Sequence, residues 1–465
     1  MALMKSISGI RGTIGGEPGS ALTPPDIVKY TAAFAALLQE EAKSRKITIV
    51  VGRDGRMSGE MVRGLVVQTL VAMGVEVIDL GLSTTPTVEM AVPYLQAHGG
   101  IILTASHNPK EWNALKLLNS AGEFISAAAG KALLQKADSG DFTFAPVEQL
   151  GTVTLRDDLL QYHIHRILQH PLVRHEAIEV SNFTIVIDPI NSSGAIAVPA
   201  LLQALGVRNI TVLNAEMHGN FVHNPEPLAE NLTQLAQAVV EKNAHLGIAV
   251  DPDVDRLVFM NEDGTLFGEE YTLVAVADYV LAHQKGNTVS NLSSSRALRD
   301  VTRKHGGNYY ASAVGEVNVV EKMKEVNAVI GGEGNGGVID PRLHYGRDAL
   351  IGIALFLSHL ATSGKKASEL RRELPQYAMS KNKLELLPGM DVAALLRQVQ
   401  QLYLHEETTT LDGLKIDFAH GWVHLRASNT EPIIRVYAEA GTEAEADALA
   451  QQVMQQVTAL LPAQN

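Results

Sequence analysis

The stretch KITIVVGRDGRMSGEMVRGLVVQTLVAMGVEVIDLG, residues 46–81, alternates between two periodicities. It opens with a β-branched apolar run and closes with a second one, VEVIDLG. Between them, residues 58–74 space their apolar side chains as a helix does, and Gly74 is placed to end that helix. A strand, a helix and a second strand in this order predict a βαβ unit whose parallel strands present ligands at their carboxyl ends.

The same alternation continues along most of the chain. Residues 23–45 have helical spacing after Thr23, and GGIILTAS at 99–106 resembles a buried strand that ends in a polar loop. The pattern restarts near residue 183 and again near residue 287. After about residue 370 it changes to a helix over 391–403, two strands near 422–440 and a last helix.

These patterns predict an α/β protein with several domains. A chain of 465 residues is too long for one hydrophobic core, and typical domain sizes suggest three or four. We expect three similar α/β mixed-sheet domains followed by a C-terminal α+β domain. Their predicted bounds are 1–150, 151–256, 257–370 and 371–465.

Composition narrows the class of partner. The formal net charge of -13 argues against a nucleic acid or an acidic membrane surface as the main partner, because both are anionic. The chain has no cysteine, which excludes disulfides, thiolate metal sites and cysteine nucleophiles. The first residues lack the apolar core of a secretion signal, and no apolar run is long enough to cross a bilayer. We therefore expect a small-molecule partner and a cytoplasmic location.

The sequence DPDVDR, residues 251–256, follows the apolar run LGIAV. Asp251, Asp253 and Asp255 can converge on one point, where three unpaired carboxylates would repel one another. A hard divalent cation resolves that conflict, and Mg²⁺ with oxygen ligands is the natural choice. A solvated acidic turn is the simpler alternative, whereas a calcium loop would need further ligands that do not appear. Arg256 is placed to face a bound anion.

The sequence TASHNP, residues 104–109, ends another strand with a serine and a histidine. No G-x-S-x-G motif surrounds Ser106, so acyl transfer is disfavoured. A serine that carries a phosphate and coordinates the same Mg²⁺ would fit the aspartate loop better. From the hexapeptide alone, a plain polar turn explains the sequence equally well, and a lone histidine such as His107 is commonly structural.

Two further strands end in polar loops. In GGEGNGG, residues 331–337, Glu333 and Asn335 could present a carboxylate and an amide to sugar hydroxyls, although a glycine-rich turn needs no ligand. In RASNTEPIIR, residues 426–435, arginines, hydroxyls and an amide suit a phosphate that is bound without being transferred. A helix N-cap at Ser428 or Thr430 is the alternative there. The candidate phosphate-binding residues are Arg426, Ser428, Asn429, Thr430 and Arg435.

The four loops, taken in this order, resemble the α-D-phosphohexomutase family over nearly the whole chain. TASHNP is similar to the phosphoserine loop of that family, and DPDVDR is similar to its metal loop, D-G-D-x-D-R, with Pro252 in place of glycine. GEGNGG resembles its sugar loop, G-E-x-S-G, and RASNTEP resembles its phosphate loop. SGIRG with Arg11, VGRDGRMSG with Arg53, and EWNALK with Lys116 add to the resemblance.

The resemblance implies four domains arranged around a central active-site cleft, and a reaction that interconverts the 1-phosphate and the 6-phosphate of a hexose or hexosamine. Phosphorylated Ser106 would give its phosphoryl group to the sugar, and the bisphosphate intermediate would turn around before Ser106 takes back the other phosphate. The implied cofactors are one Mg²⁺ per chain and a hexose or hexosamine 1,6-bisphosphate as activator.

The resemblance also implies a role for each candidate residue. The metal would lie on Asp251, Asp253, Asp255 and the phosphate of Ser106. Arg11 and Lys116 would lie near the reacting oxygens and assist proton transfer, and His107 is a further catalytic candidate. Arg256, Glu333 and Asn335 would bind the substrate together with the phosphate loop.

Two positions depart from the family pattern and bear on substrate and proton transfer. Asn335 replaces a serine, and Gly337 replaces a histidine, so that the proton-transfer role would pass to another group such as His107 or His344. An asparagine here resembles acetylglucosamine-phosphate mutases, which favours an amino sugar. We therefore expect conversion of glucosamine 6-phosphate to glucosamine 1-phosphate. Phosphomannomutase or phosphoglucomutase activity, a sugar-phosphate phosphatase and a non-catalytic binding module are the alternatives.

Overall fold

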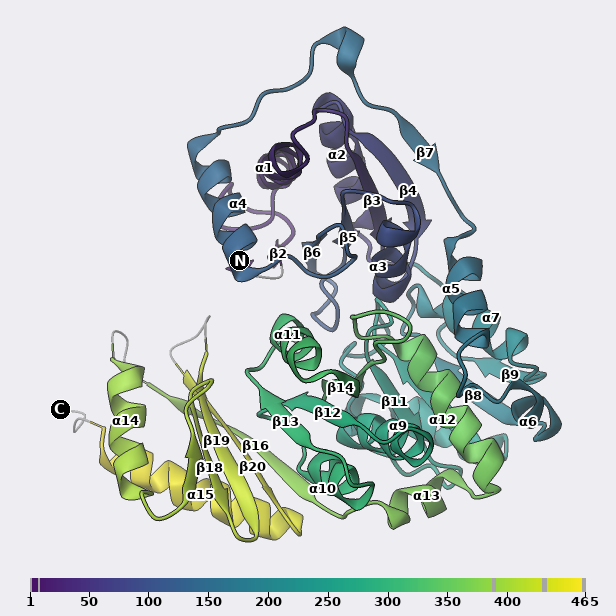
Figure 1. The fold of residues 1–465 in the computed structure, drawn as a ribbon, viewed down its shortest axis with the longest axis vertical. Coiled ribbons are helices and arrows are strands. Elements are labelled where there is room, and N and C mark those ends of the chain that lie inside the picture. Colours follow the sequence, from purple (N-terminus) through teal and green to yellow (C-terminus); the bar gives the residue numbers. More distant parts are fainter. Residues whose placement is uncertain (1, 7–8, 387–389, 429–432, 462–465) are drawn as a thin grey trace.

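The computed structural model describes residues 2–6, 9–386, 390–428 and 433–461. In this part of the chain the strands form four separate sheets, each built from elements that are close in sequence. Each sheet, together with the helices that pack on it, is called a body here. Figure 1 shows the first body above the second and third, with the fourth beside the third. The predicted class, three α/β units and a C-terminal α+β unit, is confirmed.

The first body contains the predicted βαβ unit in a mixed sheet of order β1-β2-β6-β5-β3-β4-β7. β3 pairs in parallel with β4 and β5, while β6 runs antiparallel between β5 and β2. Its strands are β1 Leu3–Ser6, β2 Gly9–Thr13, β3 Thr48–Arg53, β4 Glu76–Leu82, β5 Gly99–Leu103, β6 Trp112–Leu118 and β7 Val153–Leu155. Its helices are α1 Pro24–Ala42, α2 Gly59–Ala72, α3 Thr85–Tyr94 and α4 Ala127–Ser139.

The second body has a sheet of order β11-β10-β8-β9. Its strands are β8 Thr184–Asp188, β9 Asn209–Val212, β10 Leu246–Val250 and β11 Leu257–Met260, and its helices are α5 Leu159–Leu168, α6 His175–Val180, α7 Gly194–Ala204 and α8 Thr233–Glu241. DPDVDR connects β10 to β11, which pair antiparallel. The boundary predicted at residue 256 therefore falls between two strands of one sheet.

The third body has the order β13-β12-β14-β15. Its strands are β12 Asn287–Asn291, β13 Tyr309–Ser312, β14 Ala328–Glu333 and β15 Gly337–Ile339. Its helices are α9 Glu269–His283, α10 Ala297–Lys304, α11 Glu316–Val326, α12 Ala349–Ser363 and α13 Ala367–Glu373. The sugar loop predicted from GGEGNGG connects β14 to β15, which pair antiparallel.

The fourth body is an antiparallel sheet of order β16-β20-β19-β18-β17 with two helices. Its strands are β16 Ala378–Glu385, β17 Glu407–Thr409, β18 Leu414–Phe418, β19 Gly421–Ala427 and β20 Ile433–Ala440, and its helices are α14 Val392–Leu402 and α15 Glu443–Ala459. Buried aliphatic side chains of the sheet pack with those of α14 and α15 in a core of their own.

One continuous hydrophobic core joins the second and third bodies. Phe259 on β11 stacks on Phe356 of α12 with ring centroids 3.9 Å apart, and Phe267 packs edge-on against both rings. Because protein cores are close-packed, the loops at the ends of these two sheets are held in a fixed relation to each other. No helix in the described part of the chain is long and apolar enough to span a bilayer.

Candidate active site

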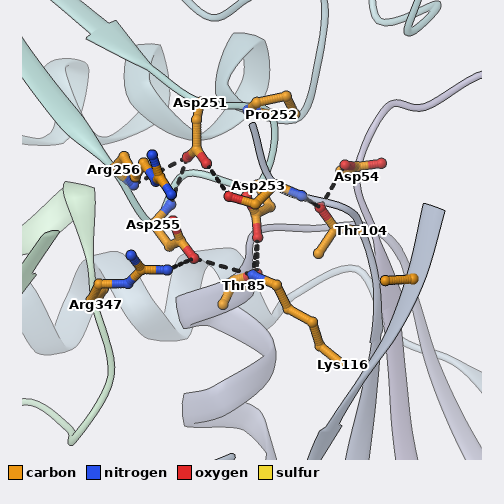
Figure 2. Close-up of polar contacts among 12 residues, drawn as sticks. Asp54, Thr85, Thr104, Lys116, Asp251, Pro252, Asp253, Asp255, Arg256 and Arg347 are labelled. Carbon is orange, nitrogen blue, oxygen red and sulfur yellow. Dashed lines mark hydrogen bonds and ion pairs between the residues drawn. The ribbon is translucent and has the colours of Figure 1, made fainter. Parts of the chain in front are cut away.

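The loop between β10 and β11 brings three carboxylates together (Figure 2). Asp251, Asp253 and Asp255 are fully buried, and each offers an oxygen within 4.8 Å of the others. Val254 has φ +64°, a left-handed conformation that is costly for a β-branched residue and that folds the loop tightly. The carbonyl oxygen of Pro252 accepts hydrogen bonds from two serine hydroxyls, which fix the start of the loop.

The aspartate oxygens are suited to a hard cation. Asp251 Oδ1 accepts the backbone N–H groups of Asp255 and Arg256, both at 3.1 Å. In contrast, Oδ1 of Asp253 and Oδ1 of Asp255 are buried without a hydrogen-bond partner among the described residues. Buried carboxylate oxygens normally have partners, and Mg²⁺ prefers ligands of this type. The residues therefore fit the predicted Mg²⁺ site.

Two cations share the charge of the triad. Lys116 Nζ lies 2.7 Å from Asp253 and 3.1 Å from Asp255, and Arg347 lies 2.7 Å from Asp255 Oδ2. Burial alone would raise the pKa of Asp255, but Arg347 and Lys116 lower it below its usual range. Burial raises the pKa of Asp251 well above its usual range, and Asp253 and Asp255 raise it further. A cation bound beside Asp251 would favour the ionised form of its carboxyl group.

Ser106 lies at the edge of this triad. Its Oγ donates a hydrogen bond of 2.7 Å to Asp251 Oδ2, although the two residues are far apart in sequence. Ser106 has φ +50°, and its N–H donates to Thr104 Oγ1 at 2.9 Å. TASHNP is thus a tight turn, and that turn directs the hydroxyl at the aspartates, where a phosphate on Oγ would share their metal.

Arg56, which the sequence analysis did not single out, fixes the serine loop. Its buried guanidinium donates to backbone carbonyl oxygens of the loop and pairs with Asp54 at 3.1 Å. The accepting carbonyls belong to Ser106, Asn108, Pro109 and Trp112. A single sequence gives no signal for this contact beyond the polar GRDGR run. Arg53, the residue named from that run, instead donates to the Asp54 carbonyl and pairs with Glu60.

Arg11 and His107 flank the serine. Arg11, on β2, donates to Asn108 Oδ1 at 2.9 Å, and the neighbouring strand β6 carries Lys116. His107 Nδ1 lies 3.4 Å from Ser106 Oγ. Burial lowers the pKa of His107 well below its usual range, and the nearby charges of Arg256 and Arg11 lower it further. The ring is therefore neutral.

Arg347, also missed from sequence, connects the metal loop to the sugar loop. Besides Asp255, it bonds Glu316 at 2.9 Å and Glu333 at 2.9 Å. Glu333 additionally accepts from the side-chain amide of Asn291 at 2.8 Å. Asn335 lies 3.5 Å from Glu333 through its amide nitrogen. The predicted sugar-binding pair is thus held in place by buried charge.

The predicted phosphate loop lies only partly within the described residues. Arg426 on β19 and Arg435 on β20 are directly opposite each other on neighbouring antiparallel strands. Arg426 also lies 3.8 Å from Asp412. Like charges opposite each other destabilise a sheet unless an anion lies between them. Ser428, whose N–H donates to the Ile433 carbonyl, begins the loop. Asn429 and Thr430 lie outside the described residues.

One cavity of about 210 Å³ joins all four bodies. Arginines of the second and fourth bodies and Lys381 of the fourth line it together with carboxyl and amide groups of the second and third bodies, a mixture that suits a phosphorylated sugar. The residues that matter here are His107 from the first body, Glu226 and Arg256 from the second, Glu270, Glu333 and Asn335 from the third, and Arg426 and Arg435 from the fourth. His344 does not line this cavity.

Family models match nearly the whole described chain. The phosphoglucomutase/phosphomannomutase α/β/α domain I matches residues 4–144, domain II residues 161–264, domain III residues 268–377, and the C-terminal domain residues 379–456. A structure of a phosphoglucomutase/phosphomannomutase family protein from Burkholderia thailandensis superimposes with a TM-score of 0.84 at 25% identity, covering 99% of each chain.

Curated relatives extend over almost the same length. A phosphoglucomutase/phosphomannomutase of Thermococcus kodakarensis is 37% identical over 94% of this chain and 94% of its own. A probable phosphoglucosamine mutase of Methanopyrus kandleri is 32% identical, again over 94% of each chain. These matches show that the chain belongs to the phosphoglucomutase/phosphomannomutase family, the α-D-phosphohexomutases, and is a phosphohexomutase, an isomerase of sugar phosphates.

Proposed function

We propose that this phosphohexomutase interconverts glucosamine 6-phosphate and glucosamine 1-phosphate through phosphorylated Ser106 and a bisphosphate intermediate. The observation that carries the proposal is the cavity shared by the four bodies. His107, the neighbour of Ser106, lines it from the first body, Glu333 and Asn335 line it from the third, and Arg426 with Arg435 line it from the fourth. A phosphorylated sugar matches this set of groups.

Ser106 would act as the phosphoryl carrier. Its Oγ is held by Asp251, and Lys116 and Arg11 are the cations on the neighbouring strands. When bound at Asp251, Asp253 and Asp255, Mg²⁺ would neutralise the charge that develops on the transferring phosphoryl group. A hexose or hexosamine 1,6-bisphosphate would activate the protein because it can phosphorylate Ser106.

His107 is the group that we assign to proton transfer from the attacking sugar hydroxyl. It lines the cavity, lies beside Ser106 and is neutral. Lys116 is less suited to accept a proton, because burial alone would lower its pKa but Asp253 and Asp255 raise it above its usual range. Lys116 and Arg11 would instead donate hydrogen bonds to the reacting oxygens.

Glu333 and Asn335 would hold the sugar in both orientations. A carboxylate accepts hydrogen bonds and an amide both donates and accepts, so the pair can bind neighbouring hydroxyls whichever end of the sugar faces Ser106. Arg426 and Arg435 would hold the distal phosphate each time, together with Arg256 at the cavity wall. Ser428, Asn429 and Thr430 complete this proposed phosphate loop.

Two observations favour an amino sugar. The acidic side chains of Glu226, Glu270 and Glu333 line the cavity, and their oxygens can accept hydrogen bonds from an amino group. Arg256 pairs with Glu226, Arg347 pairs with Glu333, and burial raises the pKa of Glu270 to about 8, so this recognition would rest on hydrogen bonds more than on net negative charge. Several relatives are named for this substrate, including a phosphoglucosamine/phosphogalactosamine mutase of Sulfurisphaera tokodaii that is 32% identical over 95% of this chain and 96% of its own. Phosphoglucomutase or phosphomannomutase activity is the second candidate function, because the relative from Thermococcus kodakarensis is named for both.

The substrate is tested by measuring kcat/KM for the phosphates of glucosamine, acetylglucosamine, glucose and mannose. We expect glucosamine phosphate to give the highest value. A preference of about tenfold or more for glucose or mannose, about 1.4 kcal/mol in transition-state binding, would contradict the amino-sugar proposal.

Ser106→Ala tests the carrier role. We expect turnover to fall by roughly a thousandfold or more, because no covalent phosphoryl group can form, while the affinity for the phosphosugar is retained. Ser20→Ala, which removes a hydroxyl bonded only to the Glu17 carbonyl, is the matched control. Unchanged turnover in Ser106→Ala would exclude the carrier role, and release of free phosphate without isomer formation would instead indicate a phosphatase.

A further inference from the structure

A second cluster of potential metal ligands lies outside the cavity, where the first three bodies meet. It contains His163 on α5, His344 before α12, and Asp348 at the N-terminus of α12. Asp348 Oδ2 lies 2.9 Å from His163 Nε2 and 3.3 Å from His344 Nε2. The three ligand atoms lie within 4.8 Å of one another, and His163 and Asp348 are fully buried.

The orientation of Asp348 is fixed by the helix that it caps. Its Oδ1 accepts the N–H groups of Leu350 and Ile351 at 2.8 and 3.3 Å. This leaves Oδ2 directed at the two histidines.

Glu89 supplies an independent sign that the cluster is built for a cation. It comes from α3 in the first body, is 1% exposed, and neither of its carboxylate oxygens accepts a hydrogen bond from the described residues. Its Oε2 lies 3.5 Å from Nδ1 of His344. Buried carboxyl oxygens normally have hydrogen-bond partners, so the contacts among the described residues do not account for this side chain.

The far side of each ring is arranged as in metal sites. Metal-bound histidines usually donate their other N–H to a carboxylate, a carbonyl or a hydroxyl, which fixes the ring. The Nδ1 of His344 faces Glu89, and the Nδ1 of His163 lies 3.0 Å from the hydroxyl of Thr87. Both Nε2 atoms are thereby directed at Asp348.

We propose that His163, His344 and Asp348 form a second, structural metal site, which takes a borderline divalent ion of the zinc class and is separate from the Mg²⁺ triad. Two imidazole nitrogens and one carboxylate oxygen suit Zn²⁺ rather than Mg²⁺, which prefers oxygen ligands. Glu89 faces the outer ring nitrogen of His344 and would fix the orientation of that ring.

The ion would add a further link at a place where the three bodies already meet through backbone hydrogen bonds, such as the one from the N–H of Thr85 to the Asp253 carbonyl at 2.9 Å. α3 packs against α5, and α5 packs against α12, in the region where the cluster lies. The first turn of α3 also reaches the catalytic loop, since Thr85 Oγ1 donates to Asp253 Oδ2 at 2.6 Å. Loading the second site therefore stabilises the position of the first body relative to the metal loop.

The test is zinc retention by the full chain in the presence of excess Mg²⁺, which keeps the aspartate triad filled. The protein is stripped with a chelator, reloaded with micromolar Zn²⁺ and millimolar Mg²⁺, dialysed, and its zinc content measured by elemental analysis. We expect one retained equivalent in the wild type, and an affinity at least about tenfold weaker in His344→Gln and in His163→Asn. Zinc should also raise the Tm of the wild type but not of these variants.

His170→Gln is the matched control, because His170 forms another buried pair, 3.2 Å from Asp340, that has no further ligand. It should retain zinc as the wild type does. Co²⁺ loaded in the same way should give the strong visible absorption of a low-coordinate, nitrogen-containing site, whereas octahedral oxygen ligation at the triad absorbs only weakly, and this readout is available even if one variant folds poorly. Equal zinc retention in the wild type and both cluster variants, or no retention by the wild type, would overturn the proposal.

Discussion

Individual residues show why the metal loop needs a cation. Asp253 and Asp255 each keep one oxygen buried without a partner in the described structure, while their other oxygens bind Lys116 and Arg347. Burying a carboxylate oxygen without a partner costs free energy, and a bound cation removes that cost. These two buried oxygens therefore have the chemistry of cation ligands.

Asp253→Asn tests this reading of the loop. The amide lowers the negative charge of the site, so we expect the Mg²⁺ concentration for half-maximal activity to rise by about tenfold or more. The wild type should lose activity in EDTA and regain it with Mg²⁺. Asp263→Asn, in the turn after β11, is the control and should leave the Mg²⁺ requirement unchanged. Full wild-type activity in the chelator would rule out the metal role.

At the scale of elements, the site depends on two loops at strand ends and on the residues that hold those loops. The loop after β5 owes its shape to Arg56, which satisfies four of its carbonyls from the neighbouring strand-end loop. The loop after β10 is fixed by serine hydroxyls at the N-terminus of α7. Buried hydrogen bonds from other segments of the chain, and not the turn preferences of the loop residues themselves, therefore fix the shape of both loops.

Arg56→Met tests how strongly the guanidinium of Arg56 stabilises the conformation of the serine loop. The change leaves Asp54 as an unpaired buried carboxylate and removes the donors of the loop carbonyls. We expect the free energy of unfolding to fall by about 3 kcal/mol or more, as measured by urea denaturation. Turnover should fall as well, because Ser106 loses its fixed position. Arg45→Met, an exposed arginine of the same body, should change stability little, and a small effect of Arg56→Met would contradict the anchoring role.

In the whole molecule, the fourth sheet and the loop that carries Ser106 and His107 contribute residues to the same cavity. The fourth body is attached to the third through Arg296, whose guanidinium donates to the Gly421 carbonyl at 2.8 Å and pairs with Asp417 at 3.1 Å. Lys415 donates to the Leu292 carbonyl at 2.9 Å. These contacts hold β19 and β20, with Arg426 and Arg435, at the cavity.

Inorganic phosphate tests that part of the cavity. Because Arg426 and Arg435 repel each other across the sheet, a bound anion should stabilise the folded protein, and we expect phosphate to raise the Tm of the wild type. Arg435→Gln should show a smaller rise at the same phosphate concentration and ionic strength, whereas Arg397→Gln on α14 should match the wild type. An equal rise in Arg435→Gln and the wild type would show that phosphate binds elsewhere.

The sequence by itself determined the local elements and the chemistry at their ends. The strand-helix-strand stretch at 46–81 became β3, α2 and β4, and the DPDVDR and TASHNP loops follow strands as predicted. These features are readable because hydrophobic periodicity and turn residues act over a few neighbouring positions. The predicted end of the second domain, residue 256, falls inside a sheet, since β11 beyond it pairs with β10.

Only the tertiary structure decided which groups meet. It brought Ser106 to Asp251, a separation of 145 residues, and Arg347 to Asp255, a separation of 92. It also turned β6 antiparallel, which set Lys116 beside the triad, and gathered His163, His344, Asp348 and Glu89 where three bodies join. Such contacts leave no local pattern, because buried charges are selected by the partners that folding brings to them and not by their neighbours in the chain.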